Sequence, residues 1–359
     1  MKKWLLAALI LLSGCASPEK GTSKSTASQN PTADASTETE VIAENLQVPW
    51  DITKLDDTFF ISQRGGNIVH VLPNGKKELM ELKLSQPVLH EGEGGLLGFE
   101  LDPGFSQNHL AYVYHTYHDG ERILNRIIQI QKQENLWKET KVLLAGIPGG
   151  FIHNGGRLAI GPDSKLYVTA GDAGMKQSAQ NIQTLSGKIL RLNLDGSVPE
   201  DNPFEDSYVF SYGHRNPQGI AWSENRTMYA AEHGQSAHDE INIITPGKNY
   251  GWPVIEGGEK KAGMETPMIH SGNETWAPSG MAYHDGKLFI ATLRGEKLLA
   301  LNLENKEMTV FFDQGGRLRD VYVDNDSLYV VTNNTDGRGT PAENDDRLLY
   351  LSLLKNGDI

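Results

Sequence analysis

A strand–turn–strand unit that recurs six times restricts the fold of this chain more than any other feature. Each copy has a small residue, a short apolar strand, a polar turn, a stronger strand and a closing strand. The copies begin at Trp50, Gly95, Gly155, Gln218, Ser279 and Arg319. Repeats of roughly 40 to 60 residues, each too small to bury both faces alone, are typical of β-propellers. We therefore predict an all-β fold, a six-bladed β-propeller with four-stranded blades; a β-sandwich or two small barrels would not need the unit six times.

The rest of the sequence agrees with an all-β domain over residues 41–359. Short apolar runs are separated by glycine, asparagine and aspartate turns, and no long apolar stripe of helical period is visible. In such a ring the first strand of each unit would line a central channel. The loops at one end of the channel would then carry any functional site.

The N-terminus has the features of a bacterial lipoprotein signal. Lys2 and Lys3 precede an apolar run, Trp4 to Leu12, that is too short to span a bilayer. The run ends in a lipobox-like Leu-Ser-Gly-Cys at Cys15, the only cysteine of the chain, so neither an internal disulfide nor a cysteine metal site is expected. We predict a signal peptide over 1–14, lipidation of Cys15 and an extracytoplasmic protein held at the membrane by this anchor. The alternative is an ordinary signal peptide with an incidental cysteine.

Residues 15–40 are mostly small, polar or charged, which predicts a flexible tether. The formal net charge of the whole chain is −13. Phosphate binding requires clustered cations, and no stripe of lysine and arginine is visible. Nucleic acid is therefore excluded as an expected partner.

Two segments carry candidate catalytic groups. His153 precedes the paired glycines of a channel-lining strand, which places it at the channel mouth, where an imidazole could act as a general base. A structural histidine is the alternative. The segment SYGHRNPQG crowds His214, Arg215, Asn216 and Gln218 into one turn. Such a cluster binds an anion or a carbonyl, or it holds the turn with its own side chains.

Two further segments carry candidate ligand-binding groups. Glu232, Asp239 and Glu240 surround a glycine-containing loop, and oxygen-rich loops suit calcium, although no EF-hand spacing is present. Arg317 and Arg319 lie two positions apart, so in a strand both side chains face the same side. Two such arginines favour a ligand with several carboxylates. Surface salt bridges are the alternative.

Together these segments resemble the soluble pyrroloquinoline-quinone (PQQ) dependent glucose and aldose sugar dehydrogenase family. The resemblance covers nearly the whole chain from residue 41. Its most specific pieces are GEGGLLGFELDPGF, HNGGRLAIGPDSKLYVTAGD, SGKILRLN, GHRNPQGIAW, DEINIITPGKNYGWP and RLRDVYV, in that order.

The resemblance implies roles for particular residues. His153 matches the base that takes the proton of the anomeric hydroxyl, Asp172 matches the group that orients it, and Arg215 with Asn216 matches the pair beside the reactive carbonyls. Arg317 and Arg319 match the residues that hold the PQQ carboxylates. Calcium sites are implied at the backbone oxygens of Gly234 and Gln235 and, as a structural site in some members, at Glu240 and Tyr250.

Two cofactor-contacting positions depart from the family pattern. Glu93 stands where the family commonly has glutamine, and a carboxylate there would repel an anionic cofactor unless it is protonated or engaged by a metal ion. Arg294 replaces a lysine, which keeps the charge but changes the reach of the side chain.

The function that the resemblance implies is PQQ-dependent oxidation of an aldose at the anomeric carbon to the lactone. The partners would be the sugar and an external electron acceptor, and the cofactors PQQ and Ca²⁺. Two alternatives remain open: a calcium-dependent propeller lactonase, and a non-catalytic lipoprotein that binds carbohydrate or protein.

Overall fold

A computed structural model describes Met1 and residues 38–354. Contacts divide the chain into residues 1–30 and 31–359, and the description below concerns the second unit. The predicted signal peptide, Cys15 and nearly all of the tether lie outside the described residues. The first strand, β1 (Thr39–Ala43), begins two residues before the predicted start of the domain. No helix among the described residues is long and apolar enough to cross a membrane.

The strands fall into six consecutive groups, with two very short helices, α1 (Phe105–Asn108) and η1 (Lys176–Gln180). The groups are β2 (Pro49–Leu55), β3 (Thr58–Gln63), β4 (Asn67–Val71) and β5 (Lys77–Lys83); β6 (Leu96–Leu101), β7 (Leu110–His118), β8 (Ile123–Gln133) and β9 (Leu136–Pro148); β10 (Leu158–Ile160), β11 (Leu166–Ala170), β12 (Lys188–Leu192) and β13 (Val209–Tyr212); β14 (Pro217–Trp222), β15 (Met228–Glu232), β16 (Glu240–Ile244) and β17 (Ile269–His270); β18 (Pro278–His284), β19 (Lys287–Thr292), β20 (Leu298–Asn302) and β21 (Met308–Phe312); and β22 (Leu318–Asp324), β23 (Ser327–Thr332) and β24 (Leu348–Ser352) with β1.

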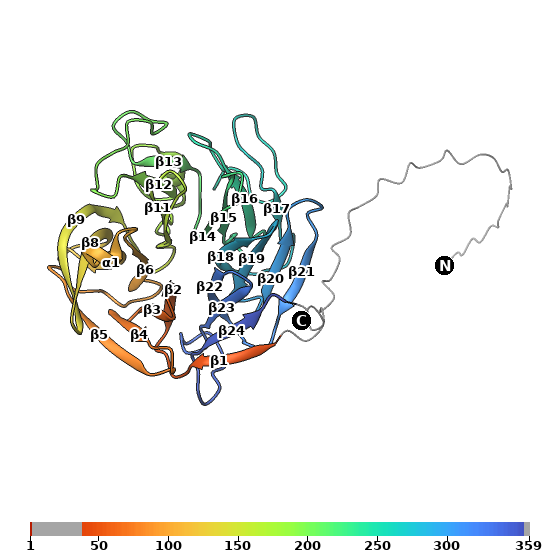
Figure 1. The fold of residues 1–359 in the computed structure, drawn as a ribbon. Coiled ribbons are helices and arrows are strands. Elements are labelled where there is room, and N and C mark those ends of the chain that lie inside the picture. The colour runs from red at the N-terminus through yellow and green to blue at the C-terminus, as the bar shows by residue number, and fades with distance from the viewer. Residues whose placement is uncertain (2–37, 355–359) are drawn as a thin grey trace. The chain divides into compact units, whose positions relative to one another are not determined.

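The groups are arranged around a common centre, as Figure 1 shows. The first strand of each group contacts the first strand of the next, and β22 contacts β2, so the ring is closed. Within each group the neighbouring strands are antiparallel. The described chain is thus nearly all-β, with many four-stranded sheets, and is consistent with the predicted β-propeller.

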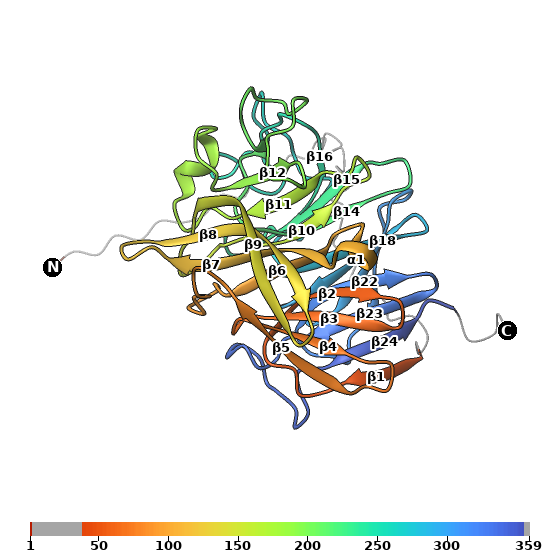
Figure 2. The same cartoon turned by 60° about the vertical axis from the view of Figure 1, so that its left-hand side comes forward.

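The sheets are not all separate four-stranded units. The first two groups form one eight-stranded sheet, which Figure 2 brings forward. The long outer strand β9 starts at Leu136, and its first residues pair in parallel with Glu81–Lys83 of β5. The repeat pattern did not indicate this junction. It depends on contact between the outermost strands of two neighbouring groups, which the pattern within one repeat does not describe.

The last sheet combines both ends of the folded chain. The strand β1 pairs with β24 in an antiparallel register that sets Thr39 opposite Leu351 and Val41 opposite Leu349. The sixth sequence copy contains only three strands, so the segment that precedes the first copy supplies the fourth. The ring is therefore fastened by backbone hydrogen bonds between the two ends of the sequence.

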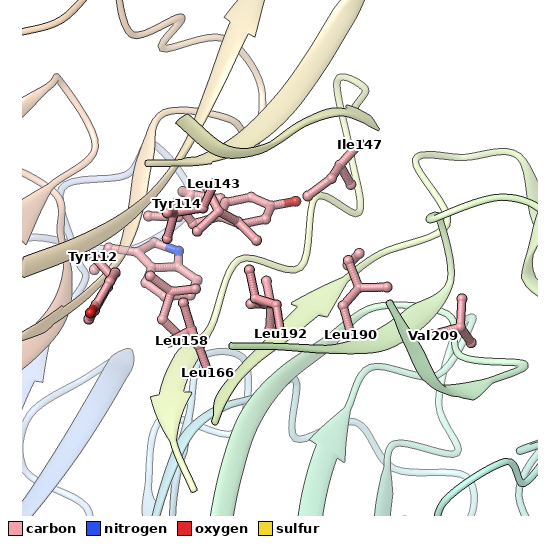
Figure 3. Packing of buried hydrophobic residues seen from close by; sticks show 14 residues of the cluster. Tyr112, Tyr114, Leu143, Ile147, Leu158, Leu166, Leu190, Leu192 and Val209 are labelled. Carbon is pink, nitrogen blue, oxygen red and sulfur yellow. The ribbon is translucent and has the colours of Figure 1, made fainter. Parts of the chain in front are cut away.

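The apolar core lies between adjacent sheets. Figure 3 shows one such cluster, which includes Tyr114, Leu158 and Leu190. The hydroxyl of Tyr114 donates to the carbonyl of Asn154 at 2.9 Å. This bond fastens the loop that carries His153 directly to the core.

The inner strands approach so closely that some positions require glycine. A Cβ on Gly98 of β6 would lie 2.3 Å from the carbonyl oxygen of Gly156, beside the start of β10. We expect Gly98→Ala to lower the free energy of unfolding by about 1–3 kcal/mol, because a backbone segment must move. Gly65→Ala is the control, since nothing lies within 4 Å of its Cβ position. Chemical denaturation measures both, and equal stabilities would contradict this account of the ring.

Candidate functional site

The predicted site residues come from loops at one end of the ring. His153 lies in the β9–β10 loop, Asp172 follows β11, and Arg215 lies in the β13–β14 loop. Glu93 precedes β6, and Arg317 precedes β22. These are the connections that enter a first strand or leave a second strand, so in an antiparallel sheet they share one end.

The His153 side chain is held by a buried carboxylate. Its Nδ1 lies 2.7 Å from Oδ1 of Asp172, whose Oδ2 accepts a 2.8 Å hydrogen bond from the indole Nε1 of Trp252. Burial alone would raise the pKa of Asp172, but His153 and the donors of Gly174 and Trp252 hold this pKa below its usual value. The ionised carboxylate favours a proton on Nδ1 of His153, which leaves Nε2 as a proton acceptor.

The backbone of His153 is equally constrained. Its φ of 59° lies in the left-handed region, which costs a non-glycine residue about 1–2 kcal/mol. The His153 amide donates to Oε2 of Glu93 at 2.9 Å, and its carbonyl accepts from the amide of Ala173 at 3.1 Å. A Cβ on Gly171 would lie 2.0 Å from that carbonyl oxygen, so only glycine fits there. These contacts fix the direction of the imidazole.

The prediction that His153 acts as a base can be tested through Trp252, whose indole donates to the Asp172 carboxylate. We expect Trp252→Phe, which removes the donor to Asp172, to lower kcat about two- to tenfold, since a hydrogen bond contributes about 0.5–1.5 kcal/mol. KM should change little, and the pH dependence of kcat should shift. Trp222→Phe is the matched control, because Trp222 packs on Tyr167 at 5.1 Å between ring centroids. Identical kinetics for the two variants would contradict the role of Trp252.

Arg215 and Asn216 lie beside this group. The Arg215 guanidinium carbon is 5.3 Å from the ring centroid of Trp252, and Nη1 donates to the carbonyl of His233 at 3.2 Å. Asn216 accepts from the amide of Gly155 at 3.0 Å. Two buried nitrogens, Nε of Arg215 and Nδ2 of Asn216, have no partner in the described structure. Both groups can therefore offer donors to a ligand.

The other histidine of this segment is structural. His214 is fully buried, with one ring nitrogen 2.9 Å from Glu232 and the other 2.8 Å from the hydroxyl of Ser211. The polar cluster thus combines the two interpretations considered for it: one member holds the turn, and its neighbours have free donors.

Arg317 and Arg319 both bond to Asn333, although Arg317 lies just before β22 and the strand register shifts between Leu318 and Asp320. Their Nε atoms bond to the carbonyl and the side-chain oxygen of Asn333, at 3.3 and 3.1 Å. Only 7% of Arg317 and 3% of Arg319 are exposed. The alternative of surface salt bridges is therefore wrong.

The two arginines differ in how their charge is balanced. Arg317 pairs with Asp336 at 3.2 Å, but Arg319 donates only to neutral oxygens, including those of Gln218 and Ser279, at 3.0 and 3.3 Å. Burial lowers the pKa of Arg319 well below its usual value. An uncompensated buried cation is costly, so Arg319 favours an anion beside it.

A cavity lies beside Arg319, and sequence reasoning missed several of the residues that line it. Its walls include Arg64, His233 and Arg338, together with Glu93 and Arg319. Burial lowers the pKa of His233 to about 4, and its buried Nε2 has no partner in the described structure. Arg64 and His233 could have been found, because each directly follows the second strand of its unit. Arg338 lies in a longer loop and gave no such signal.

Glu93 is engaged rather than free. Its Oε1 lies 2.9 Å from Nη1 of Arg338, and Oε2 accepts the His153 amide. Burial would raise the pKa of Glu93, but the His153 amide and the charges of His233 and Arg338 lower it overall. From the sequence, protonation or a metal ion is expected to offset this carboxylate, whereas in the structure the guanidinium of Arg338 does so.

In the segment predicted to bind calcium, carboxylates such as Asp239 and Glu256 already accept hydrogen bonds from the backbone. The amides of Gly234 and Gln235 donate to Asp239 at 2.9 Å and Glu256 at 2.6 Å. Among the described residues, no group of three or more His, Cys, Asp or Glu side chains could hold a metal ion. A cation here would depend mainly on carbonyl oxygens, as the resemblance implies for Gly234 and Gln235.

The predicted second calcium site is internally bonded. Glu240 accepts from the amide of Gly257 at 2.8 Å and from Asn242 at 3.1 Å. Burial first, and then the nearby Glu232, raise the pKa of Glu240 to about 8. The Tyr250 hydroxyl donates to a backbone carbonyl at 2.7 Å. Only the main chain of Tyr250 is therefore left to bind an ion.

Arg294 is set apart from the other predicted residues. Its side chain is exposed in the β19–β20 loop, and no hydrogen bond or ion pair in the described structure joins its guanidinium to them. The carbonyl of the preceding Leu293 accepts from Arg317 at 3.3 Å. Arg294 thus lies near the cavity edge without forming part of the network.

Comparison with known proteins gives the family. The family model for Glucose / Sorbosone dehydrogenase matches residues 46–349. The chain belongs to this family. A solved structure, the PQQ-bound form of aldose sugar dehydrogenase from Streptomyces coelicolor, is 38% identical with a TM-score of 0.83, and the match covers 90% of this chain and 99% of that one. The predicted resemblance is confirmed.

Two further proteins are similar to this member of the Glucose / Sorbosone dehydrogenase family. Aldose sugar dehydrogenase YliI of Escherichia coli (strain K12) is 31% identical over 350 residues, covering 85% of this chain and 92% of that one. Quinoprotein glucose dehydrogenase B of Acinetobacter calcoaceticus is 34% identical over 258 residues, 62% of this chain, and the match spans 54% of the relative's length. The protein is therefore an oxidoreductase, as the resemblance implied.

Proposed function

We propose that this protein oxidises aldose sugars at the anomeric carbon to the lactone, with PQQ as its cofactor. The observation that carries the proposal is the arrangement of one oriented imidazole, His153, beside a cavity that contains an uncompensated buried cation, Arg319. Glu93 lines this cavity and accepts the His153 amide, so a base and an anion site lie next to one another, as a sugar and an anionic quinone require. The names of the relatives support the same assignment.

The residues present fit the cofactor. PQQ carries carboxylates and carbonyl oxygens, all of them acceptors, and the cavity offers unpartnered or neutrally bonded donors. We assign the carboxylates to Arg317 and Arg319, and the quinone oxygens to Arg215 and Asn216. Asn333 accepts from both arginines, and its Nδ2, which has no partner in the described structure, adds a further donor.

The chain's own part in the reaction is proton transfer and orientation. When bound, the quinone supplies a two-electron acceptor for the hydride of the anomeric carbon. Nε2 of His153 takes the proton of the anomeric hydroxyl, and the Asp172 carboxylate stabilises the imidazolium that forms. The donors of Arg215 and Asn216 stabilise negative charge that develops on an acceptor oxygen. The sugar loses a hydride and a proton and becomes the lactone.

The proposal also covers the metal sites, the number of blades, the location of the protein and the electron acceptor. We assign Ca²⁺ to the backbone oxygens of Gly234 and Gln235, with Glu240 and the main chain of Tyr250 as a second site. We interpret the closed ring as six blades, two of them joined through β5 and β9. Lipidation of Cys15 and an extracytoplasmic location follow from the sequence alone, and an external electron acceptor would reoxidise the cofactor.

The test is reconstitution of the purified protein with PQQ and Ca²⁺. We expect saturable PQQ binding, followed by bleaching of the quinone absorbance when glucose or another aldose is added. A chelator added beforehand should weaken binding if calcium takes part. Absence of PQQ binding would overturn the proposal and favour a non-catalytic propeller, whereas lactone hydrolysis without PQQ would favour a lactonase.

A further inference from the structure

Glu93 connects two loops that lie on either side of the cavity. Its carboxylate accepts the His153 amide with one oxygen and pairs with Arg338 with the other, both at 2.9 Å. The Glu93 amide also donates to the carbonyl of Phe151 at 2.8 Å. A single side chain thus spans from the backbone of the base to the loop between β23 and β24.

The bond to His153 holds a conformation that the chain would otherwise avoid. The φ of 59° is in the left-handed region, so the His153 backbone keeps this form only because its neighbours impose it. Of the two backbone groups of His153, the amide depends on Glu93 and the carbonyl on Ala173. Loss of the Glu93 contact would leave the His153 amide without its acceptor, and the backbone that directs the imidazole would be less firmly held.

Arg338 is shared between two carboxylates. It binds Glu93 through Nη1 and Asp336 at 3.1 Å through Nη2, and Asp336 also binds Arg317. The chain of charges therefore runs from Glu93 through Arg338 and Asp336 to Arg317. This chain links the support of the base to the arginines of the cavity.

The charge balance of the cavity depends on this link. The cavity is lined by the guanidinium groups of Arg64, Arg319 and Arg338 and by one carboxylate, that of Glu93. The charge of Arg317 is balanced by its pair with Asp336. The excess is two positive charges. Without Arg338 the excess would be one, and Glu93 would face the cavity without its partner.

The chemistry of the Glu93 side chain matches that of Arg338. A glutamine could still accept the His153 amide, but it would be neutral. Its second polar group, an NH₂, would then face the guanidinium, which has only donors. A carboxylate can serve both neighbours at once, so the glutamate and the arginine suit one another.

We infer that Glu93 and Arg338 act as a coupled pair, in which Glu93 is a positioning residue for His153 and Arg338 cancels the repulsion that Glu93 would exert on an anionic ligand. The inference rests on the proposed function and deepens it. The departure of Glu93 from the family pattern is therefore compensated within this chain. Glu93 acts through the His153 backbone and need not touch the sugar.

A double-mutant cycle tests the pair in the full-length protein. The variants are Glu93→Gln, Arg338→Gln and both together, compared with Arg122→Gln, which breaks the exposed 2.8 Å pair of Arg122 with Asp119 away from the cavity. The readouts are the PQQ dissociation constant, kcat and KM for the sugar, and the thermal midpoint of the protein without PQQ. Glu93 and Arg338 keep 23% and 45% of their side chains exposed, so these polar replacements should fold.

The expected results differ for each variant. Arg338→Gln should weaken PQQ binding about tenfold, because a buried carboxylate loses its partner. Glu93→Gln should bind PQQ at least as tightly as the wild type but lower kcat several-fold with little change in KM. The double variant should bind PQQ within about threefold of the wild type and recover most of the lost kcat, because glutamine can accept the His153 amide once no guanidinium faces its NH₂.

The outcomes separate this inference from the proposed function. If the wild type binds PQQ but the two single effects simply multiply in the double variant, or Glu93→Gln leaves kcat unchanged, the coupling is wrong. If the wild type binds no PQQ but the thermal midpoints are non-additive, the pair is real and the proposed function fails. Arg122→Gln should change none of the readouts.

Discussion

Replacement of His153 by alanine should reduce the sugar-driven turnover of the PQQ-loaded enzyme by about 10²- to 10⁴-fold. The reason is that Nε2 is the proton acceptor, and Asp172 holds the other ring nitrogen at 2.7 Å. Stopped-flow absorbance of the quinone, recorded after mixing with an aldose, measures the reductive step directly. The loss should appear in kcat.

The matched control is His109→Ala. His109 is also a histidine with positive φ, at 57°, but it lies at the end of α1, away from the site loops. This variant should turn over sugar at the wild-type rate. PQQ should bind to His153→Ala about as well as to the wild type, because the arginines are unchanged. A His153→Ala enzyme with more than a tenth of the wild-type kcat would show that another group is the base.

Arg319→Gln should weaken PQQ binding about ten- to a hundredfold, since hydrogen bonds to charged groups contribute about 1.5–3 kcal/mol each. The same change should leave the protein without PQQ equally stable or more stable. Arg319 is 3% exposed and bonds only to neutral oxygens, so its charge is costly in the folded state. Burial lowers the pKa of Arg319, which means that folding disfavours its charged form.

The sign of the stability change is the informative part. Equilibrium dialysis gives the PQQ affinity, and thermal unfolding without PQQ gives the stability. Arg191→Gln is the control, because Arg191 is equally buried but pairs with Asp163 and Asp201, both at 2.8 Å. That variant should lose stability and keep its PQQ affinity. A large loss of stability in Arg319→Gln would instead make Arg319 a structural residue.

Much of the site could be predicted because the repeat fixes where loops end. A residue just before a first strand, such as His153 or Asn216, or just after a second strand, such as Asp172, reaches the same end of the ring in every unit. The spacing of Arg317 and Arg319 predicted that they would act together, and both bond to Asn333, although Arg317 lies outside β22. These conclusions need only local geometry, which one sequence contains.

The rest depends on contacts across the ring. The partner of Glu93 is Arg338, 245 positions away, and no periodicity connects them. The repulsion expected from Glu93 was a reasonable concern, because the sequence shows the carboxylate but not the cation beside it. The pairing of β5 with β9 and the exposed position of the Arg294 side chain could not be predicted for the same reason.

The pairing of β1 with β24 also determines when folding can be completed during synthesis of the chain. Thr39 must wait for Leu351, which is translated more than three hundred residues later, so the ring stays open until nearly the whole chain has been synthesised. Contacts of such sequence separation form slowly, because the entropy of closing a long loop must be overcome first. During that interval β1, whose pairing partner is β24, has no neighbour and can pair with another chain. A chaperone that covers unpaired strand edges would therefore be most useful before the ring closes.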